Sequence, residues 1–167
     1  MKKILILLLC LFLCACSEKV PVLKKTNAEE VFSFVTEYGI EETGRAEDEE
    51  WTGVNFFGNV ERADYLVSFI ISKDNQVMDM VISAEGRVDR EFLYDLCSIL
   101  LENEWAKERV EKDLREVLDN EAGGKISFKN DSLILEGDIT ISKVSLELKD
   151  VHFTEWYLER TTHERNK

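Results

Sequence analysis

Few residues of this chain carry side chains suited to catalysis or metal binding. It contains 2 histidines, and neither His152 nor His163 has other strong zinc ligands at a suitable spacing. Cys97 lies among leucines, which indicates a small buried side chain, because a reactive thiolate needs a cationic neighbour. We therefore expect no metal and no cofactor, and the sequence assigns no catalytic residue.

Carboxylates are abundant, and they keep one enzymatic alternative open. Asp79, Glu85, Glu136 and Asp138 lie in or beside predicted strands. Two carboxyl groups about 5 to 9.5 Å apart across a cleft are able to cleave a glycosidic bond. The chain has 34 acidic residues, too many to select a pair. A hydrolase of envelope material with paired carboxylates is thus the alternative to a binding protein, and a cleft beside these residues is its requirement.

The acidic run Glu47-Asp48-Glu49-Glu50 raises a further alternative, calcium binding, since calcium takes six to eight oxygen ligands. The run lacks the alternating Asp or Asn residues and the central glycine of an EF-hand loop. Adjacent carboxylates on an extended chain also point apart. We expect residues 41–50 to form a solvated loop.

The charge of the chain excludes one class of partner. It has 34 acidic and 21 basic residues, a formal net charge of −13. Nucleic-acid binding depends on Lys and Arg that neutralise phosphates, so we expect no nucleic-acid partner. With 44% hydrophobic residues and a single proline, the chain is expected to fold as one domain, over residues 27–158.

Strand patterns occur in two groups. Residues 51–57, 64–72 and 77–83 are rich in β-branched and aromatic residues and are separated by turn-forming sequences. Residues 125–128, 133–141 and 144–151 form the second group. In 133–141 and 144–151, apolar and polar residues alternate, which is typical of strands with one side facing water.

Helical patterns precede each group of strands. Asn27 and Glu30 have the spacing of a capping box, and an apolar stripe runs from Ala28 to Tyr38 before Gly39. A long helix is predicted from about Arg90 to about Leu118, with a kink or a division near residues 103–107 as an alternative. The sequence thus predicts an α+β fold, with an antiparallel sheet of about five or six strands and two helices, the second long, on one face. The order of elements also suggests a tandem repeat of one helix plus three strands.

Some apolar residues exceed what one core face needs. A second stripe of the long helix and a cluster near the C-terminus are the two groups. The simplest account is that the C-terminal cluster folds back over the long helix. The alternative is a surface for a protein or small-ligand partner, where aromatic anchors are enriched. Its candidate residues are Tyr94, Leu101, Trp105, Phe153, Trp156 and Tyr157.

The first residues have the layout of a secretory signal, with Met1-Lys2-Lys3 before an apolar run from Ile4 to Leu13. The run is too short for a mature membrane span. Leu13-Cys14-Ala15-Cys16 resembles the lipobox, the signal of bacterial lipoproteins. The resemblance implies that the Cys16 thiol carries a diacylglyceryl group and that cleavage occurs before Cys16. An ordinary signal peptide is the alternative, but no small-x-small cleavage site lies nearby.

The resemblance gives the organisation that we expect. Residues 1–15 are a signal peptide, 16–26 a lipidated N-terminus and tether, and 159–167 a polar tail. Two acyl chains hold a protein stably at a bilayer, so the membrane is the expected first partner. The sequence thus predicts an extracytoplasmic lipoprotein at the bacterial cell membrane or outer membrane. Its most plausible activity is non-catalytic binding.

Overall fold

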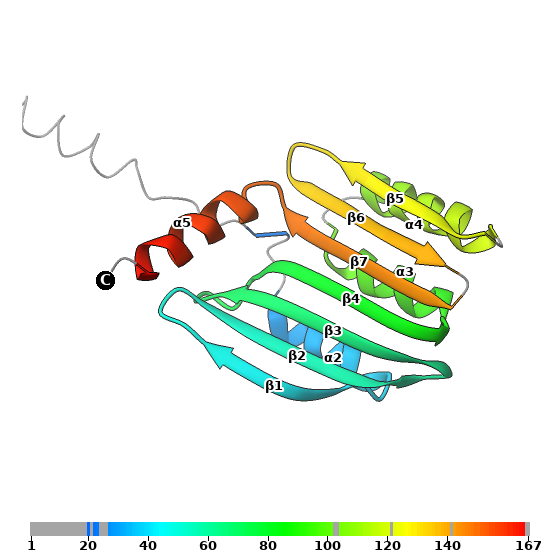
Figure 1. Ribbon diagram of the computed structural model, residues 1–167, viewed down its shortest axis with the longest axis horizontal. Helices are drawn as coiled ribbons and strands as arrows, with labels where there is room; N and C mark the ends of the chain where they lie inside the picture. The colour runs from blue at the N-terminus through cyan, green and yellow to red at the C-terminus, as the bar shows by residue number, and fades with distance from the viewer. Residues whose placement is uncertain are drawn as a thin grey trace, which may run out of the picture.

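The computed structural model describes residues 20, 22–23, 27–101, 104–120, 122–140 and 142–165. Within these residues seven strands form one sheet, accompanied by four helices (Figure 1). The helices are α2 (Ala28–Glu37), α3 (Arg90–Ile99), α4 (Glu104–Asp119) and α5 (Phe153–Arg165). The strands are β1 (Glu41–Glu47), β2 (Trp51–Val60), β3 (Arg62–Ser72), β4 (Val77–Arg87), β5 (Gly124–Lys129), β6 (Leu133–Thr140) and β7 (Lys143–Asp150).

The sheet has the order β1-β2-β3-β4-β7-β6-β5, and every neighbouring pair is antiparallel. Its two halves are meanders that meet where β4 pairs with β7. Figure 1 shows α2, α3 and α4 together behind the sheet, whereas α5 projects from the end where β7 finishes. The other face of the sheet, which we call the open face, has no helix over most of its area.

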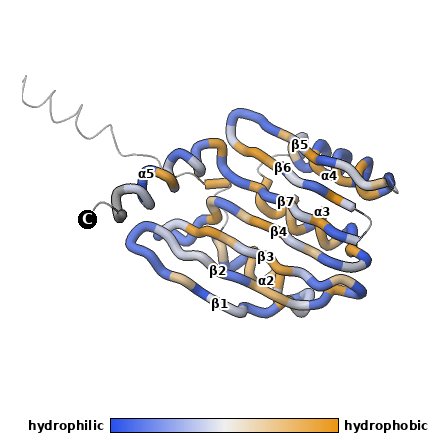
Figure 2. Tube along the Cα trace, viewed as in Figure 1, coloured by the Kyte–Doolittle hydropathy of each residue, from blue (hydrophilic) through white to orange (hydrophobic). Residues whose placement is uncertain are grey.

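Alternation along each strand creates the main core. Val67, Ile82 and Leu146 lie directly opposite one another on β3, β4 and β7, and all three are buried under the helices. Burying such a side chain contributes roughly 1.5 to 3 kcal/mol. In Figure 2 the tube is orange over much of β3 and β4 and blue at the acidic turn between β1 and β2. The sheet is therefore apolar where the helices cover it and polar at its rim.

Capping side chains fix where two of the helices begin. Asn27 precedes α2, and its side-chain oxygen accepts a hydrogen bond from the backbone N–H of Glu29 at 3.0 Å. Asp89 precedes α3 and accepts from the backbone N–H of Phe92 at 3.1 Å. Such caps satisfy amides that have no partner inside the helix. The helix predicted to start beside Asn27 is confirmed.

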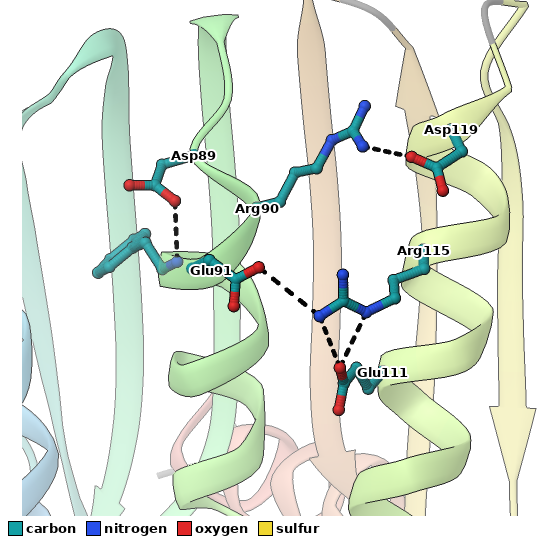
Figure 3. A network of polar contacts seen from close by, with 7 residues as sticks. Asp89, Arg90, Glu91, Glu111, Arg115 and Asp119 are labelled. Carbon is teal, nitrogen blue, oxygen red and sulfur yellow. Dashed lines mark hydrogen bonds and ion pairs between the residues drawn. The ribbon is translucent and has the colours of Figure 1, made fainter.

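Ion pairs orient α4 against α3, as Figure 3 shows. Arg115 bonds Glu111 on its own helix at 2.7 Å and reaches Glu91 of α3 at 3.6 Å. Arg90 of α3 pairs with Asp119 near the end of α4. All these side chains are substantially exposed, and exposed ion pairs contribute about 0 to 1 kcal/mol each. The packing of α3 against α4 therefore depends mainly on their buried apolar side chains.

The α+β fold and the antiparallel sheet are confirmed, but the predicted strand number is wrong. The sheet has seven strands rather than five or six. The additional strand is β1, which falls in the segment expected to be a solvated loop. It has no apolar side because it lies at the edge of the sheet and is exposed along most of its length. Backbone hydrogen bonding to β2 holds it in place.

The prediction of one long helix is also wrong, because the helical region divides into α3 and α4. Leu100 and Leu101 are adjacent and both fully buried. Ile99 is the last residue of α3, Leu100 is its C-cap, and α4 begins at Glu104, so one helix does not run through this region. The alternative prediction, a division near residue 103, is therefore the correct one.

The C-terminal segment forms a fourth helix, which the sequence did not predict. Helix α5 continues to Arg165, through much of the expected polar tail. The tandem repeat of one helix plus three strands stays a prediction. The first half of the sheet contributes four strands and the second half three, around the central pair β4 and β7.

Candidate functional site

The structure divides the six residues of the predicted partner surface between two places. Tyr94 and Leu101 are buried in the main core, which explains the second stripe. Arg115 of α4 lies over the Tyr94 ring, 4.5 Å from its centroid, because α4 packs along that side of α3. Trp105 is 62% exposed at the start of α4, with its ring centroid 6.0 Å from that of Phe128. Among the six residues of the predicted partner surface, only Trp105 has a largely exposed aromatic ring.

The three C-terminal aromatic residues form a second, smaller core. Phe153 and Trp156 are each 5% exposed and cluster with Met78, while Tyr157 packs at the margin of this cluster. The Tyr157 ring centroid lies 5.9 Å from that of Trp51 at the start of β2. The expected folding of this segment over the long helix is therefore wrong.

A bulge in β4 explains this position. Ile70 lies opposite Asp79, and Ile71 lies opposite Val77, so Met78 has no partner on β3. A bulge of this kind bends the strand and re-aims a side chain. Met78 is thereby fully buried against α5 instead of in the main core.

The remaining chemistry-bearing residues are placed as follows. Cys97 is buried, and burial raises the pKa of its thiol to about 12, so it is inert as a nucleophile. His152 is exposed, after the end of β7. Cys16 lies outside the described residues, and so does the side chain of His163.

The structure brings the four candidate carboxylates to one face. Asp79 and Glu85 lie opposite Lys149 and Lys143 of β7, on the side away from the helices. Glu136 and Asp138 of β6 share that side. Period-two alternation puts all four on the open face, although they come from two strands that are not adjacent.

A shallow depression lies on the open face above β7, β6 and β5. Its volume is about 610 Å³. Its polar lining includes Lys125, Glu136, Asp138 and Glu147. The short side chains of Ser127 and Ser145 leave room between these longer ones. The lining thus contains three carboxylates and one ammonium group.

An apolar patch adjoins the depression. It consists of Phe57, Leu66 and Val81, which are 51%, 42% and 36% exposed. Phe57 of β2 lies directly opposite Leu66 of β3, and Val81 of β4 also lines the depression. These large apolar side chains are on neighbouring strands of the open face. Contiguous exposed apolar groups of this kind mark interaction surfaces in soluble proteins.

Asp79 is the most perturbed carboxyl group on this face. It is 6% exposed, and its Oδ1 has no hydrogen-bond partner. Burial, together with the nearby charge of Glu147, raises its pKa to about 7, while Lys149 opposes the rise. The Lys149 ammonium is held 2.9 Å from Glu147 instead. Asp79 thus exchanges its proton near neutral pH.

A second depression, with a volume of about 600 Å³, lies where the start of α3 approaches the end of α4. It is lined by the start of α3 and the end of α4, including Arg90 and Glu91. Both of these side chains already take part in the network of Figure 3. Its lining is thus largely committed to holding the helices together.

In the ranges that the structure describes, no group of three His, Cys, Asp or Glu side chains is placed to hold a metal ion. The acidic run ends β1 and forms its turn into β2, where Asp48 caps the turn. Over the same ranges, no helix combines the length and the apolar character needed to cross a membrane.

Comparison with known proteins adds no relative. No family model, curated protein or solved structure matches the chain. Function must therefore be argued from the site.

Sequence reasoning missed the apolar patch, although a signal for it was present. Phe56-Phe57, Leu66-Val67 and Val81-Ile82 are consecutive apolar pairs within strands. Neighbouring residues of a strand point to opposite faces, so one member of each pair must leave the main core. Which member does so depends on where the helices pack.

Proposed function

We propose that this protein is a bacterial envelope lipoprotein, anchored through Cys16, that binds a partner on the open face of its sheet without catalysis. The membrane is its first partner, and the folded domain lies outside the cytoplasm. The observation that carries the binding role is the apolar patch of Phe57, Leu66 and Val81 beside the depression.

The attachment of the N-terminal segment supports this arrangement. The Leu23 backbone N–H donates to the Val77 carbonyl at 2.9 Å, and Val22 packs against the cluster around Phe153 and Trp156. Cys16 lies six positions before Val22, and an extended chain of six residue steps spans at most about 20 Å. The α5 end of the domain would therefore stay close to the lipid surface, with the open face beside it.

Two measurements test the proposal separately. Replacement C16A should release the protein from the membrane fraction and abolish fatty acids on the mature terminus. A photo-crosslinking residue at Leu66 should form a discrete adduct in the native envelope, whereas one at the exposed Glu108 of α4 should not. Unchanged membrane retention of C16A would remove the anchor. Equal crosslinking from both positions would remove the open face as the binding surface.

A hydrolase is the second candidate, because the depression fulfils the requirement of a concave site beside paired carboxylates. Glu136 and Glu147 lie opposite each other on β6 and β7. Their Cβ atoms are about 4.5 to 5.5 Å apart, so rotation of the two side chains is able to bring the carboxyl groups to the roughly 5 Å separation of retaining glycosidases. Release of sugars from purified envelope polysaccharide, lost in E136Q, would establish this activity. No release by the native protein would exclude it for that substrate.

The calcium-binding alternative finds less support, because the acidic run does not gather into a ligand set in the described part of the chain. A melting temperature that rises in excess calcium would revive it.

A further inference from the structure

The carboxylates of the depression are incompletely neutralised. Lys125 approaches Asp138 at 3.7 Å, and Lys149 approaches Glu147 at 2.9 Å. Glu136 has no ion pair to any residue that the structure describes, although it faces Glu147 directly across the strands. Like charges in that position destabilise a sheet. The sheet thus holds negative charge that a bound cation would relieve.

A further carboxyl group of the same face lies beside the depression, outside its lining. Asp79 is 6% exposed, and its Oδ1 lacks a hydrogen-bond partner. Asp79 lies on the open face between Ile70 and Lys149. It feels the charge of Glu147, so the negative potential of the depression extends to β4.

The apolar patch and the carboxylates have a fixed spacing. The row Phe57, Leu66, Ser83, Ser145 and Asp138 crosses five strands in register. Strands lie about 4.8 Å apart, so Leu66 and Asp138 are separated by about 14 Å. Only the two small serine side chains stand between them. One extended ligand is able to reach both ends of this row.

We propose that the partner of the open face is a basic amphipathic protein segment, with an apolar side chain on the Phe57–Leu66 pair and a Lys or Arg over Glu136 and Glu147. The inference rests on the proposed binding function and names the chemistry of its partner. Glu136 and Glu147 form the next pair on the same face, two residues along β6 and β7 from Asp138 and Ser145. In an extended peptide, residues four positions apart are separated by about 13 Å, which is close to the distance from Leu66 to a point between these two carboxylates. The same carboxylates would repel anionic lipid headgroups and nucleic acid.

The test uses a fluorescent synthetic peptide with Phe and Arg four positions apart. The full chain is studied in lipid nanodiscs if it partitions to membranes and in buffer if it does not. The double variant E136Q/E147Q should weaken the anisotropy Kd at least about tenfold, and F57S should weaken it similarly. The matched control E49Q/E50Q, at the exposed turn before β2, should leave Kd within about twofold of the native value. A peptide with Glu in place of Arg should not bind.

Each outcome decides one part of the reasoning. E136Q/E147Q removes the like charges but also the partner of the Lys149 ammonium, so the melting temperature of each variant is measured, and binding is compared at a temperature where both variants are fully folded, which excludes unfolding as the cause of lost binding. If F57S weakens binding but E136Q/E147Q does not, the cationic partner is overturned while the open face keeps its binding role. If the peptide shows no saturable binding, the cationic partner is overturned, and crosslinking from Leu66 then decides the proposed function on its own.

Discussion

Replacement of Asp79 by Asn offers a direct test of the electrostatics of the open face. The carboxyl group of Asp79 is buried, and its pKa rises from 3.8 to about 7. A neutral amide of the same shape removes the charge but keeps the packing. The variant should therefore gain stability relative to the native protein as pH rises.

The magnitude follows from linkage between proton binding and folding. Each pKa unit is worth about 1.4 kcal/mol, so a rise from 3.8 to about 7 corresponds to about 4 kcal/mol. The folded state holds the proton more tightly than the unfolded chain. The penalty is therefore absent below pH 3.8, grows between pH 3.8 and about 7, and is complete above pH 7. Local relaxation reduces it, and we expect roughly 2 kcal/mol.

Urea unfolding at about pH 4 and pH 8.5 measures this difference. The free energy of unfolding of D79N minus that of the native protein should be about 2 kcal/mol larger at the higher pH. Any fixed cost of the amide cancels between the two pH values. Asp74, an exposed turn residue, provides the matched control. The free energy of unfolding of D74N minus that of the native protein should change by no more than about 0.5 kcal/mol between the two pH values. The same difference for D79N at both pH values would refute a raised pKa at Asp79.

Three further predictions concern packing. W156A should lower the free energy of unfolding by about 3 kcal/mol and accelerate hydrogen exchange in α5, since Trp156 is 5% exposed; unchanged exchange would show that α5 is held otherwise. Gly86 has φ +117°, and an added Cβ would lie 2.3 Å from the Arg62 carbonyl oxygen, so G86A should cost about 3 kcal/mol in urea unfolding. At Gly39, φ is +81° with open space around it, and G39A should cost about 1 kcal/mol, so equal costs would contradict the steric argument. The buried Cys97 thiol should react with a thiol reagent only on unfolding, and rapid native labelling would contradict its burial.

Local patterns predicted much of the sheet and the burial of Cys97. Strands β2 to β7 carry β-branched and aromatic residues with turn sequences between them, and these features act within a few residues. The strand β1 escaped prediction because its sequence is charged on both sides. An edge strand is held by backbone hydrogen bonds to one neighbour, and side-chain patterns do not record those bonds.

Helix ends and the C-terminal helix were harder to predict for a different reason. Helix α3 ends at Ile99, although Leu100 and Leu101 continue its apolar pattern and are fully buried, and no glycine or proline between Ile99 and Glu104 marks this end in the sequence. Helix α5 has little separation of apolar and polar sides, so periodicity does not reveal it. Its aromatic residues are buried because they pack against Met78, which the bulge in β4 turns toward α5.

The candidate site was only partly accessible to sequence reasoning. Asp79, Glu85, Glu136 and Asp138 were recognised as carboxylates in or beside strands, but nothing local placed them together. They share a face because the two meanders join through β4 and β7, residues far apart in the chain. The sequence pattern identifies Phe57 and Leu66 only as strand residues, and their place on the open face depends on where the helices pack.

The sequence by itself determined the alternating strands, the acidic character of the chain and the lipobox-like signal at Cys16, because composition and short-range periodicity record these properties. Only the tertiary structure decided which side of each strand became the interior. All three helices α2, α3 and α4 lie against one face, which leaves one residue of each consecutive apolar pair, Phe57, Leu66 or Val81, exposed on the other. Side-chain direction is a local property of a strand, whereas burial depends on elements that pack from elsewhere in the chain.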